Sequence, residues 1–573
     1  MVPEKQTLLS PTHPLSQQTQ FFPISKRSLQ IIMFSMVFLL FTWCCTCITK
    51  SEDIDILPIA ELLTTGPMLY ALQMVSDMGN NDSKTLVDSP LKENPNVVQK
   101  AFFALSTPHT KHQMNAFVAT FFEPVGIDIL TTTPIDWQPT LPKTLSTQVA
   151  PLYQSWAVAL HSIWKDLCRT TKILPNRQTV LHLPHPFIVP GGRFRESYYW
   201  DSYWIIQGLL ASEMEGTARG IVDNFIHSIN TYGFVPNGGR LYYLTRSQPP
   251  MLSEMILVLY EHTSDAAWLA TVVPALEVEY TYWMTEGPFG HAVRLHGHVL
   301  NRYVSANQEP RPESYKEDIA TASSSSLKNK GQVYADIIAA AESGWDFSSR
   351  WLSDGNNLNS ISTSNVLAID LNVYLHRMEK NLATFYTTLR KPKKALYYTQ
   401  AALRRENAIQ DLLWNETNCM WMDFLIGQER QSSVLSAASF FPLWSIQNSS
   451  RTECILDALQ TSTLWGKGGI ATSSVDTGQQ WDGSNAWPPI QDIIVQGLLY
   501  TEHPRGAVMA RELVRRWVTS NHAAWNESGV MYEKYNATRP GGSGSGGEYN
   551  VQVGFGWSNG VVLKFLTQYA YWL

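Results

Sequence analysis

The stretch Pro190 to Trp204 reads PGGRFRESYYWDSYW, and the prediction of fold and site starts from it. Gly191 and Gly192 allow backbone turns that other residues disfavour. The charged side chains that follow alternate with large rings, which is not the pattern of an ordinary helix face. Carboxylates and guanidinium groups bind neighbouring hydroxyls, while rings cover the apolar faces of sugars. The stretch therefore predicts a sugar-binding loop that connects two elements of secondary structure.

Further connections share this density of charged and aromatic residues, and the chain between them looks helical. Apolar residues recur at helical spacing over 395–414, around Leu513 and after Pro488-Pro489, a natural helix start. Alternating runs are scarce, with Leu241 to Leu244 as one candidate strand. We predict a mainly α-helical domain whose long connections carry the site, as in a helical barrel. The further connections are 236–250 (PNGGRLYYLTRSQPP), 311–313 (RPE), 342–351 (ESGWDFSSRW), 479–489 (QQWDGSNAWPP) and 532–557 (YEKYNATRPGGSGSGGEYNVQVGFGW).

The composition fits a large folded body. Hydrophobic residues make up 44% of the 573-residue chain and charged residues only 16%, which excludes an intrinsically disordered chain. The formal net charge is −6, and a chain without a basic excess is a poor partner for nucleic acid. Aromatic residues make up 12%, including 20 Trp, which either fill a core or line a site that stacks on sugar rings. Residues 322–332 (ASSSSLKNKGQ) predict a flexible surface insertion.

An apolar stretch from Ile31 to Ile48 carries no charged residue. Its length is near the roughly 20 apolar residues that span a bilayer as a helix. Lys26 and Arg27 precede it and acidic residues follow, so the positive-inside rule predicts a cytoplasmic tail over residues 1–30. We predict a type II signal anchor over residues 31–49, with a late-cleaved signal peptide as the alternative. The body then lies on the extracellular side of the plasma membrane or is secreted.

Cysteines and glycosylation sequons also indicate on which side of the membrane the body of the chain lies. The cysteines of the body are Cys168, Cys419 and Cys454, whose number and spacing imply neither a disulfide framework nor a metal site. One pair can still form a disulfide. Five Asn-x-Ser/Thr sequons agree with a glycosylated body outside the cell. They are at Asn81, Asn415, Asn448, Asn526 and Asn536.

The glycine-rich run Gly541–Gly547 lies between two carboxylates, Glu533 and Glu548. Such a run has high backbone entropy and no packing role of its own. It fits either a disordered loop or a lid that closes over a substrate and opens to release the product. The flanking carboxylates favour the lid.

Taken in this order, the connections resemble the motifs of the trehalase family. PGGRFRESYYWDSYW is very similar to the family's first signature and QQWDGSNAWPP to its second, and the resemblance covers roughly residues 60–573. It implies one (α/α)6 barrel over the domain 57–573, which hydrolyses α,α-trehalose to two glucose molecules with inversion. It implies no metal or organic cofactor and no obligate protein partner, so that the partner is the small-molecule substrate trehalose.

The resemblance also implies a role for each matching residue. Asp346 matches the general acid and Glu533 the general base of the family. Two departures occur, because Ser484 stands where the second signature has Pro, and Asn536 where Asp usually follows YEKY. Neither changes a predicted catalytic carboxylate. The positions that match sugar-binding residues are Arg193, Trp200, Asp201, Asn237, Arg246, Gln248, Arg311, Glu313, Gly344 and Glu548.

Hydrolysis of trehalose requires a particular protonation state and separation of these two carboxyls. Inversion needs one protonated carboxyl at the glycosidic oxygen and one ionised carboxylate that activates water, roughly 6.5–9.5 Å apart. We expect the apolar neighbours Trp345 and Phe347 to raise the pKa of Asp346, and Lys534 to help keep Glu533 ionised. Taken without the family, Asp346 also fits a helix N-cap or a salt bridge with Arg350, four residues on.

Two other functions fit the sequence. Another inverting α-glucosidase on the same barrel would act on a longer substrate, since one fold hosts many functions. A catalytically silent cell-surface sugar-binding protein comes from a different class. The presence of both Asp346 and Glu533 argues against that second alternative.

Overall fold

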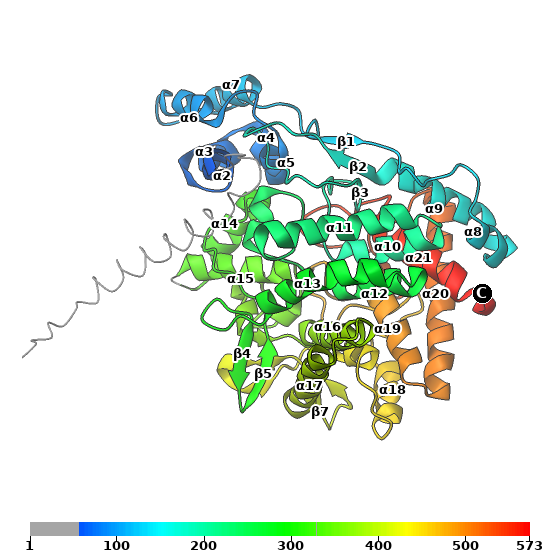
Figure 1. The fold of residues 1–573 in the computed structure, drawn as a ribbon. Coiled ribbons are helices and arrows are strands. Elements are labelled where there is room, and N and C mark those ends of the chain that lie inside the picture. Colours follow the sequence, from blue (N-terminus) through cyan, green and yellow to red (C-terminus); the bar gives the residue numbers. More distant parts are fainter. Residues whose placement is uncertain (1–56, 328) are drawn as a thin grey trace, which may run out of the picture. The chain divides into compact units, whose positions relative to one another are not determined.

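The computed structural model describes residues 57–327 and 329–573, which belong to one compact unit, Ile54–Leu573. The predicted tail over residues 1–30 and the apolar stretch over 31–49 lie outside the described residues, so the anchor stays a prediction. Among the residues described, no helix combines the length and the apolar character needed to cross a bilayer. The prediction of a mainly helical domain is confirmed (Figure 1).

Helices dominate from one end of the described chain to the other. In chain order they are α2 (Leu57–Leu63), α3 (Gly66–Val75), α4 (Asp77–Asn81), α5 (Ser83–Asp88), α6 (Pro95–Phe103), α7 (Lys111–Phe121), α8 (Lys143–Gln148), α9 (Gln154–Leu167), α10 (Asp201–Ala211), α11 (Glu215–Tyr232), α12 (Leu252–Thr263), α13 (Ala266–Trp283), α14 (Tyr315–Ser324), α15 (Lys330–Glu342), α16 (Ile369–Thr388), α17 (Pro392–Ala408), α18 (Thr452–Thr461), α19 (Pro488–Tyr500), α20 (Pro504–Ser528) and α21 (Gly556–Gln568). The 3-10 helices used below are η2 (Leu241–Thr245), η3 (Pro312–Ser314) and η9 (Ala437–Trp444).

An inner set of helices forms a closed ring of contacts. Helix α10 packs against α12, α12 against α16, α16 against η9, η9 against α19, α19 against α21, and α21 again against α10. Nearly every residue of α10, α19 and α21 is buried. Where these helices bury charge it is paired, as between Lys564 of α21 and Asp492 of α19 at 2.6 Å. The ring closes where Gly208 of α10 meets Gly560 of α21. A Cβ atom on Gly560 would lie 2.0 Å from the carbonyl oxygen of Trp204, so only glycine lets these helices approach so closely.

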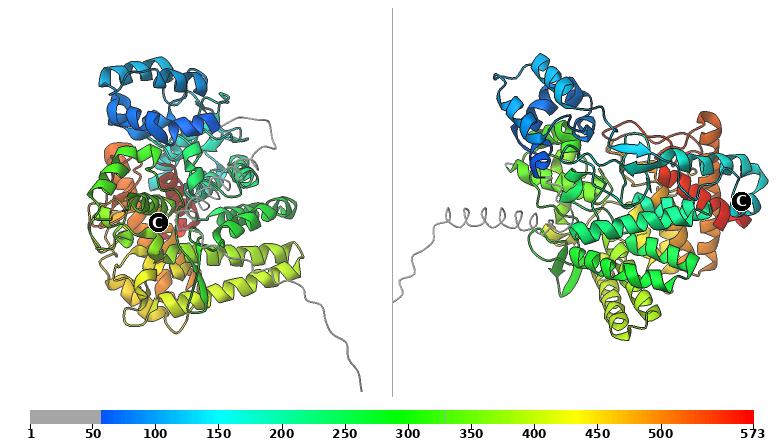
Figure 2. Two further views of the ribbon diagram at one scale, coloured as in Figure 1. Left: turned by 90° about the vertical axis from the view of Figure 1, so that its left-hand side faces the viewer. Right: turned by 45° about the horizontal axis from the view of Figure 1, so that its top comes forward.

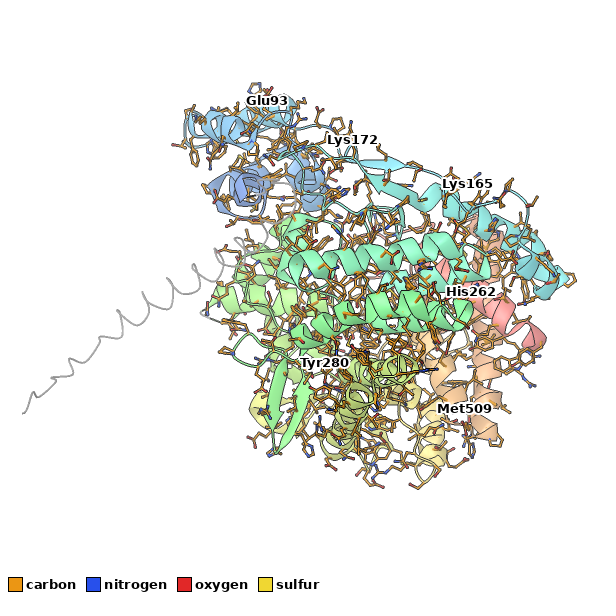
Figure 3. All side chains as sticks on the ribbon, viewed as in Figure 1. Glu93, Lys165, Lys172, His262, Tyr280 and Met509 are labelled. Atoms are coloured by element: carbon orange, nitrogen blue, oxygen red, sulfur yellow. A yellow bond between two sulfur atoms is a disulfide. The ribbon has the colours of Figure 1, made fainter. Side chains whose placement is uncertain are left out.

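Outer helices cover this ring with one apolar face and expose the other. In α20 the buried residues include Leu513, Val514 and Trp517, as the sequence pattern predicts. Hydrogen bonds between side chains also connect the outer helices to the inner ring. The hydroxyl of Tyr280 on α13, labelled in Figure 3, donates to Glu379 of α16 at 2.9 Å. The two layers hold the loops between the helices in fixed positions.

The helices α2 to α7 form a group of their own with a separate apolar core (blue in Figures 1 and 2). This group packs on the rest of the unit where α3 meets α14 and where α5 meets η3. Helix α5 begins at Asp82, whose side chain caps the backbone N–H of Lys84 at 3.1 Å. The contact with η3 brings α5 close to the loops of the helical ring.

The strands are short and antiparallel, and they join loops rather than build a core. The sheets are β1-β2-β3, β10-β9-β6, β4-β5, β7-β8 and β11-β12. In the last of these, Ala486 pairs with Tyr535, which ties the loop before α19 to the loop that carries Glu533. The bounds are β1 (Ile129–Thr131), β2 (Cys168–Thr171), β3 (Phe187–Ile188), β4 (Ala292–Leu295), β5 (His298–Asn301), β6 (Val366–Leu367), β7 (Trp414–Asn415), β8 (Met420–Trp421), β9 (Phe424–Leu425), β10 (Arg430–Gln431), β11 (Asn485–Ala486) and β12 (Tyr535–Asn536).

One local prediction is wrong. Residues 241–244 form the 3-10 helix η2 instead of a strand, because the rings of Tyr242 and Tyr243 turn toward buried carboxylates rather than to opposite faces. The predicted insertion over 322–332 is helical at both ends, since α14 runs to Ser324 and α15 begins at Lys330, and the described residues between the two helices form an irregular connection. The disulfide that the sequence left open joins Cys419 to Cys454.

Candidate active site

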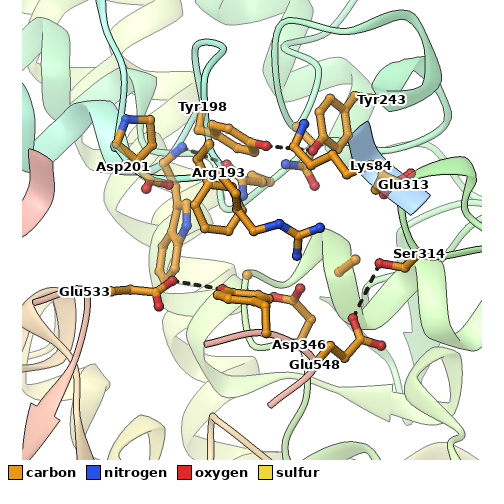
Figure 4. A pocket seen from close by; sticks show the side chains of 18 of the residues that line it. Lys84, Arg193, Tyr198, Asp201, Tyr243, Glu313, Ser314, Asp346, Glu533 and Glu548 are labelled. Carbon is orange, nitrogen blue, oxygen red and sulfur yellow. Dashed lines mark hydrogen bonds between the residues drawn. The ribbon is translucent and has the colours of Figure 1, made fainter. Parts of the chain in front are cut away.

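The predicted site residues come together in one pocket. The pocket is lined by loops that follow or precede the inner helices, and Figure 4 shows Asp201, Asp346 and Glu533 gathered around the same space. Aromatic rings from Trp481, Trp487 and Trp557 complete its wall. The predicted residues that line it are Arg193, Trp200, Asp201, Asn237, Arg246, Gln248, Arg311, Glu313, Gly344, Asp346, Glu533 and Glu548.

Asp346 lies in the loop after α15, between two fully buried rings. Trp345 is 0% and Phe347 1% exposed, and burial raises the pKa of Asp346 to about 6 although Arg311 and Arg246 oppose the shift. Gly344 makes this turn possible, because its φ is +72° and a Cβ atom there would lie 2.8 Å from the ring of Trp200. The loop therefore presents a carboxyl that holds its proton more tightly than an ordinary Asp.

The alternative interpretation of Asp346 as the partner of Arg350 is wrong. Arg350 binds Asp370 at 2.7 Å and Asp423 at 2.8 Å, and all three side chains are buried. The backbone and hydroxyl of Ser349 donate to Asp482, each at 2.7 Å. These contacts fix the loop on its far side, so Asp346 stays available to the pocket.

The second signature also supports the loop that carries Asp346. Trp481 stacks on Trp487 with ring centres 3.9 Å apart and on Trp345 at 5.1 Å. The amide of Gln480 donates a hydrogen bond of 2.8 Å to the backbone oxygen of Asp346. Ser484, the departure from the family pattern, leaves these stacked rings in place.

Glu533 is 2% exposed and has its own set of partners. The hydroxyl of Tyr549 donates to it at 2.8 Å, and the ammonium of Lys534 lies 4.0 Å away. Burial raises the pKa of Glu533 above its ordinary value, while Lys534 and Tyr549 act against that rise. Lys534 assists Glu533 as expected, but it does not outweigh burial.

Arg246 is the centre of one polar group in the pocket. Its guanidinium donates to Asn237 at 2.7 Å and to Glu313 at 2.7 Å. The ring of Tyr243 covers the guanidinium with 4.9 Å between their centres. These partners fix the direction of the Arg246 side chain while leaving donors for hydroxyl groups of a ligand.

Arg311 forms a second group near the glycine-rich run. It binds Asp318 at 2.7 Å and Glu548 at 3.2 Å, and it lies over the ring of Phe347 at 5.1 Å. Burial raises the pKa of Glu548 to about 7, against the effect of Arg311. Arg311 thus links the loop of Asp346 to the end of the glycine-rich run.

Three further predicted residues lie along the first signature. Arg193 donates to Asp82 at 2.9 Å, and the backbone N–H of Trp200 donates to Gln248 at 3.2 Å. Burial raises the pKa of Asp201 to about 8, and the nearby carboxylates of Glu533 and Asp346 add to the shift. The turn over Gly191 and Gly192 has positive φ at both glycines, as predicted.

The glycine-rich run lies against the rest of the site. The backbone N–H of Gly544 donates to the backbone oxygen of Lys534 at 2.9 Å, and that of Ser545 donates to the side chain of Asn485 at 2.9 Å. Glu548 and Tyr549 directly follow the run, and both line the pocket. The run therefore leads into the wall of the pocket in this structure.

Sequence reasoning missed several residues that line the pocket. Ser314 and Tyr549 each follow a predicted residue directly and Tyr243 lies three positions before Arg246, so proximity in sequence was an available signal. Lys84 gave no such signal, because it lies far before the first motif in the sequence. In the part of the chain that the structure describes, no cluster of three or more His, Cys, Asp or Glu side chains is arranged to hold a metal ion.

Comparisons with known proteins agree with this site. A family model named Trehalase matches residues 79–570. The trehalase of Apis mellifera is 39% identical over 529 residues, covering 89% of this chain and 84% of its own, and the trehalase of Homo sapiens is 38% identical with 89% of each chain covered. The solved structure of the neutral trehalase from Saccharomyces cerevisiae matches with a TM-score of 0.57 at 26% identity, covering 67% of this chain and 74% of that one. The chain therefore belongs to the trehalase family.

Proposed function

We propose that this protein hydrolyses α,α-trehalose to two glucose molecules with inversion, Asp346 acting as general acid and Glu533 as general base. Membership of the trehalase family supports the reaction. The observation that carries the residue assignment is the convergence of both carboxyls, from loops far apart in the sequence, on one pocket. The assignment uses this chain's own residues and no cofactor.

Asp346 has the properties that a general acid needs. Its pKa of about 6 keeps the carboxyl largely protonated in mildly acidic solution. An ordinary Asp, with a pKa near 3.9, would be ionised there and could not protonate a glycosidic oxygen. Protonation of the glycosidic oxygen matters because the leaving glucose would otherwise depart as an unstable oxyanion.

Glu533 suits the role of the base on the other side of the sugar. Tyr549 donates to one carboxylate oxygen of Glu533 at 2.8 Å, and the backbone N–H of Gln552 donates to the other at 3.5 Å. A carboxylate oxygen accepts more than one hydrogen bond, so the second oxygen can still take a proton from water. Lys534 favours the ionised form through its charge. Inversion requires room for that water, hence a separation of roughly 6.5–9.5 Å between the two carboxyls in the substrate complex.

The remaining polar residues suit the binding of two glucose units. Arg246 with Asn237 and Glu313, and Arg311 with Glu548, offer donors and acceptors whose directions are already fixed. Trp200 presents a ring to the same space. Preset partners reduce the entropy that is lost when a flexible disaccharide binds.

The arrangement of helices supports an (α/α)6 barrel for the domain 57–573. The inner ring consists of α10, α12, α16, η9, α19 and α21. It alternates along the chain with the outer helices α9, α11, α13, α17, α18 and α20, apart from α14 and α15, which lie between α13 and α16. The run Gly541–Gly547 then acts as a lid, since Glu548, the residue that follows it, binds Arg311 of the pocket at 3.2 Å. The predicted extracellular position is part of this proposal and rests on the sequence alone.

Two measurements on the full-length protein test the function. Purified protein should release glucose from trehalose faster than from maltose. Proton NMR of the first products should show α- and β-glucose in equal amounts, because inversion converts one sugar and leaves the other unchanged. Products that are only α would contradict inversion, and no release from trehalose would contradict the substrate. D346N should lose turnover while it still binds the sugar.

A further inference from the structure

A lysine from outside the helical ring reaches the wall of the pocket. Lys84 belongs to the short helix α5, and its side chain is only 4% exposed. It lines the pocket together with Tyr198 and Tyr243, and Figure 4 shows it beside Tyr243. A buried lysine is rare unless its charge is paired, so its partners show what it does.

The three hydrogen bonds of the Lys84 ammonium are all directed to the protein. It donates to Asp88 at 2.8 Å, to Glu196 at 2.6 Å and to the hydroxyl of Tyr242 at 2.9 Å. An ammonium group has three donors, so none remains for a sugar hydroxyl. Lys84 therefore acts on the pocket through its partners and not by direct contact with a ligand.

Glu196 carries the effect of Lys84 to the wall of the pocket. The oxygen that binds Lys84 also accepts the hydroxyl of Tyr198, which is 2.7 Å from the hydroxyl of Tyr243. The ring of Tyr243 lies against the guanidinium of Arg246. An uninterrupted set of contacts thus connects Lys84 to a residue of the proposed sugar site.

The charges around Lys84 explain why it is needed. Among the described residues, the three buried carboxylates of Asp88, Asp128 and Glu196 form ion pairs with two cations, Lys84 and Arg240. Without Lys84, Arg240 alone would face all three carboxylates, and an uncompensated buried charge is strongly unfavourable. Glu196 would then move, and Tyr198 would lose the partner that fixes its hydroxyl.

A second contact from the same place supports this role. Asp82 caps the start of α5 and also accepts a hydrogen bond from Arg193 at 2.9 Å. The beginning of α5 therefore holds two sides of the pocket, one through Asp82 and one through Lys84. The group α2–α7 completes the site in addition to packing beside it.

We propose that Lys84 is a positioning residue for the sugar pocket, acting through Glu196 on Tyr198, Tyr243 and Arg246. The inference rests on the proposed function, because it assigns Lys84 to the binding of that substrate. Loss of Lys84 should weaken binding of substrate and transition state alike, which raises KM more than it lowers kcat.

The variant K84M tests the proposal, since methionine keeps the length and removes the charge. A displacement of about 1 Å in a positioned group costs about 10²-fold, so we expect kcat/KM on trehalose to fall about 100-fold, mainly through KM. The matched control is K111M, in the same group of helices, where Lys111 pairs with Asp77 and its side chain is 62% exposed. K111M should keep both kinetic constants, and thermal melting and near-UV circular dichroism report whether each variant is folded.

A double-variant cycle separates positioning from a purely structural role. K84M/E196Q removes both charges of the pair, which relieves the charge imbalance. If Lys84 acts through Glu196, the double variant loses no more in kcat/KM than the worse single variant, whereas independent effects would multiply. Multiplied losses would overturn the proposal, whatever the melting temperatures show.

Y198F covers the case in which K84M does not fold, because it deletes one hydroxyl and leaves the ring. Its KM should rise about tenfold, as expected when a hydrogen bond to a charged partner is lost. A folded K84M or Y198F with the KM of the wild type would overturn the role of Lys84. This failure is distinct from failure of the proposed function, which an inactive wild-type chain would show.

Discussion

Replacing Asp482 by asparagine tests how the general acid is held. Asp482 does not belong to the predicted catalytic pair, yet its carboxylate supports the loop that carries Asp346. It accepts hydrogen bonds from the backbone and hydroxyl of Ser349, each at 2.7 Å. The hydroxyls of Ser473 at 2.9 Å, of Ser348 at 3.2 Å and of Thr477 also donate to it. D482N keeps the shape of the side chain and removes its charge, so it perturbs the support and leaves the pocket lining unchanged.

The expected loss of stability and of kcat in D482N follows from these hydrogen bonds. The backbone N–H of Ser349 cannot rotate, so in D482N the oxygen of the new amide must face it. The amide nitrogen must then face the hydroxyls of Ser348, Ser349 and Ser473. A hydrogen bond to a charged group contributes about 1.5–3 kcal/mol and one between neutral groups about 0.5–1.5 kcal/mol. The loop should lose about 2–4 kcal/mol, and a shift of about 1 Å in Asp346 should lower kcat about 100-fold.

The assay is steady-state release of glucose from trehalose, with thermal melting measured in parallel. KM should stay roughly unchanged, since the stacked rings and the guanidinium groups that face the sugar are untouched. The matched control is D476N on the same loop, where Asp476 is exposed and accepts a backbone hydrogen bond from Gly478 at 3.1 Å. D482N that melts like the control and keeps the kcat of the wild type would refute this reasoning.

Three other predictions concern the acid, the ring closure and the disulfide. With the pKa of Asp346 at about 6, deprotonation above that pH removes the acid, so kcat/KM should fall about tenfold per pH unit on the alkaline side; a constant rate between about pH 6 and 9 would contradict it. G560A places a methyl group 2.0 Å from the carbonyl oxygen of Trp204, so the melting temperature should drop by several degrees; an unchanged value would refute the close approach. C419S/C454S opens a link across 35 residues and should cost about 4 kcal/mol in unfolding free energy with activity retained; equal denaturant midpoints would argue against the link.

Much of the fold could be predicted because it depends on local patterns. The Pro488-Pro489 start of α19 and the apolar face of α20 are signals that lie within one element. The prediction of a strand over residues 241–244 was wrong because a pattern of four residues does not distinguish a strand from a tight turn. The outcome there was set by the distant carboxylates Asp88 and Glu196, which the hydroxyls of Tyr242 and Tyr243 reach.

The site was predictable where its residues share a motif and not where only packing brings them together. The first signature placed Arg193, Trp200 and Asp201 in one segment, and all three line the pocket. Lys84 has no motif, and its position depends on the contact of α5 with η3, which no sequence period encodes. The interpretation of Arg350 as a partner of Asp346 failed for the same reason, because Asp370 and Asp423 reach it only in the folded chain.

Chemical rescue of E533A tests most directly whether Asp346 and Glu533 act from opposite sides of the sugar. Removing the carboxylate leaves space for azide where water would attack, while Asp346 can still protonate the departing glucose. Azide should restore turnover of trehalose, and the product should be β-glucosyl azide. An α-glucosyl azide would contradict the inverting arrangement of these two carboxyls, and turnover by E533A equal to that of the wild type without azide would remove Glu533 as the base.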